Sequence, residues 1–304
     1  MGLVHQFFNV ALVIMIVSTM VTAGLGITLD ELSTTFRQIR LVALVLVANL
    51  LVVPLIGWGI AALFSLSTSA YIALILIASS PGGPFGAKLA MMQRGEVVAG
   101  AGMQVLLALI GSVTFAVTAN WILETANVGG GISLPVANLI KTVVLLQVVP
   151  FLVGLSIRQW SSERAGKWRP YTLKTSTAAL LLVLASAILG NGQQIAELFG
   201  STTVLAVLLY SAGVIATGAL MVIGTMETRT TLALVTQMRS TGPAFAAIVI
   251  AFNDNPSILG AATAIALVEL AIAVPLAVYL GRSRQSRERI GPVAVPPLEF
   301  GHPR

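Results

Sequence analysis

The chain has 304 residues, of which 57% are hydrophobic and only 9% are charged. A soluble domain carries roughly 25% charged residues, so this composition excludes an ordinary soluble protein and predicts an all-α polytopic membrane protein. There is no cysteine, which excludes disulfides, thiolate metal sites and thiol nucleophiles.

Nine apolar stretches are long enough to cross a bilayer, which requires roughly 20 residues each. In chain order, we expect spans at residues 7–28, 40–64, 69–93, 97–121, 134–158, 172–191, 202–224, 229–253 and 256–280. The third span is interrupted at Ser79 to Pro84 and the eighth at Arg239 to Pro243. Single prolines elsewhere, at Pro54, Pro150 and Pro275, predict simple kinks.

The positions of the cationic residues support this number of spans. When successive loops alternate between the two sides, 14 of the 17 Lys and Arg residues fall on one side and none on the other. The positive-inside rule then places the N-terminus outside and the C-terminus in the cytosol, in a plasma (inner) membrane. The net charge of +6 therefore reflects topology and not nucleic-acid binding, and residues 282–304 are expected to form a disordered basic cytosolic tail.

Two features repeat along the chain. The pattern G-x-G-x4-E-L begins at Gly24 and again at Gly190, and a Gly-Pro pair breaks a span at Gly83 and again at Gly242. We therefore expect one membrane domain, 1–281, with inverted repeats at 7–121 and 172–280 joined by a linking helix at 134–158. The offset of five spans turns the second repeat upside down relative to the first.

The two broken spans carry the functional prediction. Unwound backbone at membrane depth is tolerated only where it is buried in protein or lines a cavity. Paired breaks in inverted repeats mark the binding site of secondary transporters, because half-helix ends offer free amides and carbonyls. The expected substrate-binding residues are Pro81, Gly82, Gly83, Pro84, Lys88, Arg239, Ser240, Thr241, Gly242 and Glu269.

At these breaks the sequence resembles the bile acid:sodium symporter family. The run from Ser79 to Lys88, followed by Arg94-Gly95-Glu96, is similar to that family's C/S-P-G-G-T-x-S-N and R-G-N/D motifs. Residues 24–29, Gly-Leu-Gly-Ile-Thr-Leu, match its G-M-G-L-T-L stretch, and residues 236–244 lie where it carries E-x-G-M-Q-N-x-G-L-A.

The resemblance implies a fold and a class of activity. It implies a core domain, here spans two, three, four, seven, eight and nine, in which the two broken helices cross. Spans one, five and six would form a panel domain. An organic anion would bind between the two domains near the crossing and move by alternating access.

The sequence departs from the family at the positions that bind Na⁺. Relatives carry Ser, Asn, Glu and Gln there, whereas this chain has Gly86, Ala87, Val235 and Arg239. Sodium, like other hard cations, needs several oxygen ligands, and no acid remains to supply one. We therefore expect no metal site, no cofactor and no sodium coupling.

Four ionisable residues lie at membrane depth: Lys88, Lys141, Arg239 and Glu269. Each costs about 2.5–3.5 kcal/mol on insertion scales and is a functional candidate. We hypothesise that Arg239 and Lys88 supply in fixed form the charge that bound Na⁺ supplies in relatives. Glu269 would carry a proton, making proton coupling an alternative, or neutralise Arg239. The structural alternatives are a buried Arg239–Glu269 pair and lysines that reach the interface.

Other classes of function fit this sequence less well than a carrier. Both histidines lie at the termini, and the spans contain no paired aspartates or H-E-x-x-H, so no enzyme is expected. A receptor or sensor, or an anion uniporter or channel of the same fold, remains as the alternative. The expected partners are a small organic anion and the lipid bilayer, with no nucleic acid.

Overall fold

The computed structural model describes residues 2–83, 85–128, 137, 141, 144–199 and 202–290, and every regular element within these ranges is a helix. Four helical stretches are long and apolar enough to cross a membrane: Ile39–Leu63, Val97–Thr125, Thr202–Met221 and Pro256–Ser286. The prediction of an all-α polytopic membrane protein is therefore confirmed.

Helix boundaries follow the apolar stretches closely. The described helices are α1 (Gly2–Leu25), α2 (Leu29–Arg37), α3 (Ile39–Val47), the π-helical turn η1 (Ala48–Val52), α4 (Val53–Leu63), α5 (Thr68–Ala78), α6 (Gly86–Met92), α7 (Val97–Thr125), the π-helical turn η2 (Val144–Val148), α9 (Val149–Trp160), α10 (Ser162–Phe199), α11 (Thr202–Met221), α12 (Met226–Gln237), α13 (Thr241–Ala251) and α14 (Pro256–Ile290).

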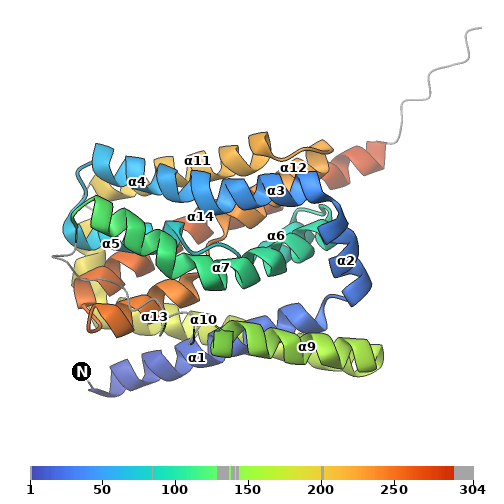
Figure 1. The fold of residues 1–304 in the computed structure, drawn as a ribbon, viewed down its shortest axis with the longest axis horizontal. Coiled ribbons are helices and arrows are strands. Elements are labelled where there is room, and N and C mark those ends of the chain that lie inside the picture. The colour runs from blue at the N-terminus through green and yellow to red at the C-terminus, as the bar shows by residue number, and fades with distance from the viewer. Residues whose placement is uncertain are drawn as a thin grey trace, which may run out of the picture.

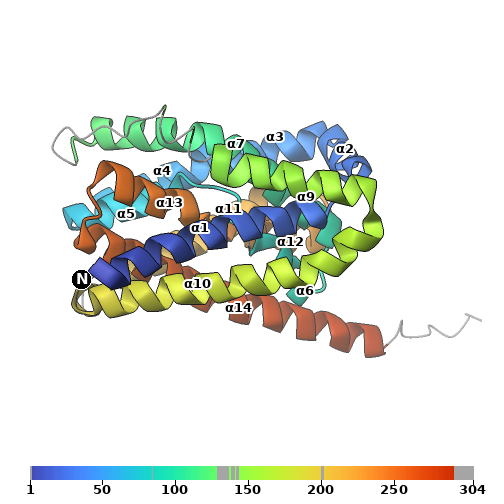
Figure 2. The ribbon, with the colours of Figure 1, turned by 90° about the horizontal axis from the view of Figure 1, so that it is seen from below.

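The helices stack in layers (Figures 1 and 2). Helices α1, α9 and α10 form one outer layer, and α3, α4, α11 and α12 form the opposite one. Helices α5, α6, α7, α13 and α14 lie between them, and most of the largest cluster of buried apolar residues belongs to this middle layer. The broken helices therefore lie in and beside the best-packed part of the molecule.

Two helices extend well beyond their predicted spans. Helix α10 (Ser162–Phe199) begins before and ends after the predicted span 172–191, so residues expected in a cytosolic loop are helical. Helix α14 continues to Ile290, so the expectation of disorder from residue 282 is wrong for residues 282–290. Contacts of Arg284 with α12 and with the α6–α7 connection hold this extension against the rest of the molecule. Part of the predicted span 134–158, and the chain after residue 290, lie outside the described residues.

Two of the prolines lie directly after π-helical turns. η1 precedes Pro54 and η2 precedes Pro150, each near the start of the following helix. Proline lacks an N–H and its ring clashes with the preceding turn, and one extra residue per turn relieves both problems. These are the local distortions that the sequence predicted only as kinks.

A short helix, α2, joins the α1 layer to the α3 layer at the cation-rich end of the molecule (Figure 1). It begins with a capping box. The Thr28 N–H donates to Glu31 Oε2 at 2.9 Å, and the Glu31 N–H donates to Thr28 Oγ1 at 3.2 Å. These bonds satisfy amides that a helix start leaves unpaired, so the Thr28–Glu31 pair marks where α2 begins.

Candidate functional site: the meeting point of two broken helices

The two broken helices meet at their breaks. The first is the pair α5–α6, interrupted from Ser79 to Phe85, and the second is α12–α13, interrupted from Met238 to Ser240. The Gly83 N–H donates to Met238 O at 2.9 Å, and the Ser240 N–H donates to Ser80 O at 2.8 Å. Each unwound segment thus satisfies a backbone group of the other, which meets the requirement for irregular backbone at membrane depth.

Glycines allow this close approach. Gly82 has φ +79°, and a Cβ on it would overlap the backbone of Ala108 in α7. A Cβ on Gly83 would overlap the carbonyl oxygens of Met238 and Arg239 in the opposite break. At Gly242 the nearest atom would be the side-chain Cγ1 of Ile16, at 2.8 Å. Neighbouring backbone atoms therefore leave no room for a side chain at Gly82 or Gly83. At Gly242 the obstacle is only the Ile16 side chain, which can move.

Most of the predicted residues at the breaks are enclosed. Pro81, Gly82, Gly83, Ser240 and Gly242 are buried, whereas Thr241, at the start of α13, is half-buried. Pro84 lies outside the described residues. The backbone hydrogen bonds between the breaks therefore bring Gly83 and Ser240 together at one point in the fold, whereas Lys88 lies beyond the first break, on α6.

Arg239 is a charged residue enclosed at this point, with 1% of its surface exposed. Its Nη1 donates to Asn49 Oδ1 at 2.7 Å and to Thr236 O at 3.4 Å. Its Nη2 donates to Ala78 O at 2.5 Å and to Asn49 O at 3.3 Å. Ala78 and Thr236 lie at the C-terminal ends of α5 and α12, so the guanidinium occupies the negative ends of two half-helix dipoles.

Asn49 is a site residue that the sequence analysis missed. It lies in η1 and is fully buried, and its Nδ2 donates to Val45 O at 3.0 Å and to Thr236 Oγ1 at 3.1 Å. The π-helical turn leaves the Asn49 carbonyl free for Arg239, a common use of such turns at functional sites. A single amide side chain in an apolar span, five residues before a proline, was the available signal.

Glu269 is equally enclosed, with 1% of its surface exposed, on α14. Its Oε1 has no hydrogen-bond partner among the described residues. No ion pair within 4.0 Å joins it to Arg239, although both residues lie in the described part of the chain. The hydroxyl of Tyr210 and the amide of Gln237 are likewise buried without a described partner. The buried Arg239–Glu269 ion pair considered from the sequence is therefore not formed here.

Two of the positions that correspond to sodium ligands, Gly86 and Val235, lie beside each other, and neither residue itself carries a side-chain oxygen. A Cβ on Gly86 would lie 3.3 Å from Val235 Cγ2 and 3.2 Å from Gln104 Oε1. Val235 is buried in an apolar cluster with Leu232 and Met103. Two methyl groups thus stand where the resemblance places a carboxylate, and among the described residues no group of three or more His, Asp or Glu could hold a metal ion. A hard cation such as Na⁺ binds several oxygen ligands, and Gln104 Oε1 is a side-chain oxygen that lies beside Gly86.

A cavity opens beside the crossing, between α1, α6, α7 and α10. The centre of a water-sized sphere can reach about 50 Å³ of it, and the space between its walls, open solvent at the mouth included, is about 530 Å³. Of the predicted site residues, Lys88 lines it, whereas the buried guanidinium of Arg239 is not among its lining groups. A second cation, Arg169 from α10, also lines it. The sequence placed Arg169 only among topology-determining loop cations, so its position in the cavity was missed.

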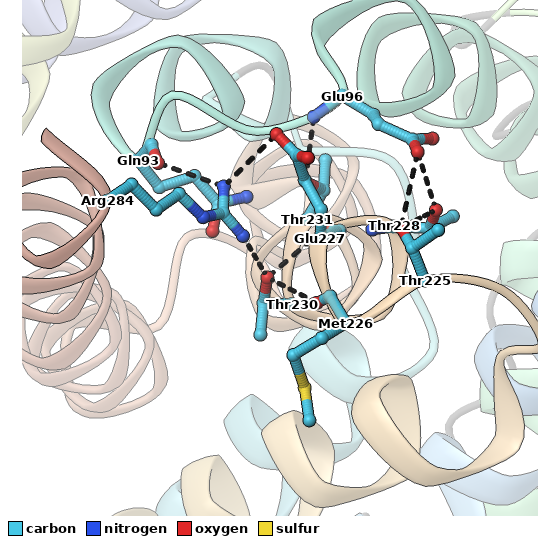
Figure 3. Close-up of polar contacts among 9 residues, drawn as sticks. All are labelled: Gln93, Glu96, Thr225, Met226, Glu227, Thr228, Thr230, Thr231 and Arg284. Atoms are coloured by element: carbon cyan, nitrogen blue, oxygen red, sulfur yellow. Dashed lines mark hydrogen bonds and ion pairs between the residues drawn. The ribbon is translucent and has the colours of Figure 1, made fainter. Parts of the chain in front are cut away.

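A polar network fastens the outer ends of the broken helices (Figure 3). Arg284 of α14 donates through Nη1 to Gln93 O at 3.0 Å and through Nη2 to Thr230 Oγ1 at 2.6 Å. Glu96 accepts from Thr228 Oγ1 at 2.7 Å, and its N–H donates to Thr231 Oγ1 at 3.1 Å. The network therefore joins the α6–α7 connection, α12 and α14 into one body at the end away from the breaks.

Comparison with known families identifies part of this arrangement. The model of the Sodium Bile acid symporter family matches residues 13–198, more than half of the chain. The matched part includes the first broken helix, α5–α6, and the cavity walls α1, α7 and α10, and it ends before α12. A search of curated proteins finds no match.

Proposed function

The chain belongs to the Sodium Bile acid symporter family, and we propose that it is a secondary active transporter that moves a small organic anion by alternating access. Family membership and the apolar helices make it an integral membrane protein of a symporter-type transporter family. The reciprocal hydrogen bonds between the two breaks support a site built on half-helix ends, as in other secondary transporters.

The proposed architecture has nine spans in inverted repeats, residues 7–121 and 172–280, with the segment 134–158 between them. The layer of α1, α9 and α10 would be the panel, and the remaining helices would be the core that moves against it. The polar network in Figure 3 joins the α6–α7 connection, α12 and α14 at their outer ends. This supports a core that moves as one body. We place the protein in the plasma membrane with its N-terminus outside, because the Lys and Arg residues of the loops fall on one side of the nine-span topology.

One observation carries the proposal on coupling: Arg239 lies where the carbonyl ends of two half-helices converge. In sodium-coupled carriers, such C-terminal carbonyls coordinate the ion. Here Ala78 O and Thr236 O accept from the guanidinium instead. Arg239 would thus act as a tethered cation that takes over the electrostatic role of Na⁺ at the crossing.

The replacement of the family's sodium-ligand residues also supports transport without Na⁺. Val235 stands in place of a carboxylate, beside Gly86, and a guanidinium at Arg239 would repel a second cation in the enclosed crossing. We infer that transport does not require Na⁺. Glu269, buried without a described partner, is the remaining group at the crossing that could bind and release a proton. The substrate would be bound at the crossing and in the adjoining cavity lined by Lys88.

The function is tested with purified protein in detergent. Small organic anions are screened for an increase in unfolding temperature, each with sodium chloride and with choline chloride at the same ionic strength. We expect a subset of anions to stabilise the protein equally in both salts, since a ligand that binds only the folded state raises its stability. Stabilisation by anions only in sodium chloride would contradict the proposed coupling, and no stabilisation by any anion would contradict the proposed substrate class.

A further inference from the structure

The cavity beside the crossing carries two cationic side chains on facing layers of the molecule. Lys88 belongs to α6 of the middle layer, and Arg169 belongs to α10 of the outer layer. No ion pair to either is found among the described residues, and no acidic residue is among the lining groups of the cavity. This wall therefore carries two positive charges that the described part of the protein does not compensate.

Each cation is held in place by packing and not by an opposite charge. The Lys88 Nζ lies 5.7 Å from the centre of the Phe85 ring, a cation–π contact. The Arg169 guanidinium lies flat against Gly26, where a Cβ would come within 2.9 Å of Nε. That Nε is buried and has no hydrogen-bond partner among the described residues. The side chain is thus fixed at the cavity with part of its donor capacity unused.

A crevice continues the cavity inward. It shares Ala23, Gln104 and Val105 with the cavity and ends against Phe151 of α9. Its remaining walls are mostly apolar, with Met20, Ala108 and Leu109 among them. The combined space therefore has a cationic part near the α6 and α10 side chains and an apolar part deeper between α1 and α7.

We propose that this cavity binds a small organic dianion with a short apolar body, one negative group on Lys88 and the other on Arg169. The proposal rests on the proposed transport function and names its substrate class. A monoanion would leave one of the two cations unpaired in a partly enclosed space, which is unfavourable. A dianion compensates both, so the cavity distinguishes the two classes by charge.

The same arrangement gives the substrate a part in the conformational change. Two like charges on facing layers repel each other as the layers approach, and a bound dianion removes that repulsion. A ligand shifts a conformational equilibrium only by binding one state better than the other. The dianion meets that condition, because it contacts both layers at once.

The test is equilibrium binding in detergent by calorimetry, without Na⁺ and without any gradient. Succinate, glutarate and adipate are each compared with the monocarboxylate of the same chain length. At least one dicarboxylate is expected to bind about tenfold more tightly than its monocarboxylate, because it makes a second charge pair. In Lys88→Met and in Arg169→Met, that ratio should fall to about one. The matched control is Lys174→Met, an exposed cation on α10, which should keep the wild-type ratio.

Two further variants separate charge from folding. Lys88→Arg and Arg169→Lys retain the charge and should keep a preference for the dicarboxylate. A ratio near one for all three lengths in the wild type overturns the proposal, as does a preference that survives either Met variant. These outcomes leave the proposed function standing, because anion stabilisation and uptake without Na⁺ are measured with any ligand that the screen identifies.

Discussion

Replacing Arg239 by Ala removes the cation that lies between the two half-helix ends, and it should destabilise the protein strongly. The two shortest contacts of the guanidinium, to Ala78 O at 2.5 Å and to Asn49 Oδ1 at 2.7 Å, would be lost in a fully buried site. A buried acceptor left without a donor costs about 1–3 kcal/mol, so these two contacts correspond to about 2–6 kcal/mol. The expected fall in unfolding temperature is about 5–15 °C.

The variant should also respond to a small cation of matching shape. Guanidinium chloride at a low, non-denaturing concentration can occupy the space that the side chain leaves and donate to the same carbonyls. It should restore part of the lost thermal stability and uptake, whereas choline chloride at the same ionic strength should not. Arg239→Lys should be intermediate, because an ammonium keeps the charge but lacks the planar set of donors.

The assay is thermal unfolding in detergent together with uptake of a stabilising anion into proteoliposomes. The matched control is Arg229→Ala, on α12, the helix that ends just before Arg239, and it removes a single hydrogen bond to Ala219 O outside the crossing. It should show no response to guanidinium. If Arg239→Ala unfolds at the wild-type temperature and transports normally, Arg239 does not hold the two half-helices together and the reasoning is refuted.

Three other changes have definite expected outcomes. Gly83→Ala should cost about 3 kcal/mol of stability and abolish uptake, because the new Cβ would overlap backbone atoms. Gly242→Ala should cost about 1 kcal/mol or less, because its Cβ would meet only a side chain that can move. Equal losses of stability in thermal unfolding would contradict this difference. Arg284→Met should cost about 1–2 kcal/mol by removing its two hydrogen bonds, and unchanged thermal stability would show that the network in Figure 3 is not stabilising. A tag after Arg304 should be reached only from the cytosol and a tag near Gly130 only from outside, and a cytosolic tag at Gly130 would contradict the nine-span topology.

The sequence was sufficient to predict the helices and their two breaks. Long apolar stretches gave most of the helix boundaries to within a few residues, and the Gly-Pro pairs located both interruptions. Membrane helices are easier to delimit than soluble ones, because the bilayer sets their minimum length and requires internal backbone hydrogen bonding. The extension of α14 to Ile290 was missed because it is polar, and contacts of Arg284 hold it in place.

The partners of the site residues could not be predicted from the sequence. Arg239 was expected to face the substrate, but its guanidinium contacts Asn49, which is 190 positions away in the chain. That contact depends on the π-helical turn η1, which the sequence predicted only as a kink at Pro54. Arg169 was assigned to a cytosolic loop by the charge pattern, yet it lines the cavity because α10 is one continuous helix of 38 residues. The local sequence pattern predicts where the helices lie, whereas the packing of the helices decides which side chains come into contact.

The central claim is that a tethered guanidinium replaces Na⁺ in this transporter. The most direct measurement is the initial rate of uptake, into proteoliposomes, of an anion that stabilises the protein, with external Na⁺ and then with K⁺ or choline in its place. Equal rates in all three salts are predicted, together with a loss of uptake in Arg239→Gln. A steep fall in the wild-type rate when Na⁺ is withdrawn would contradict the account.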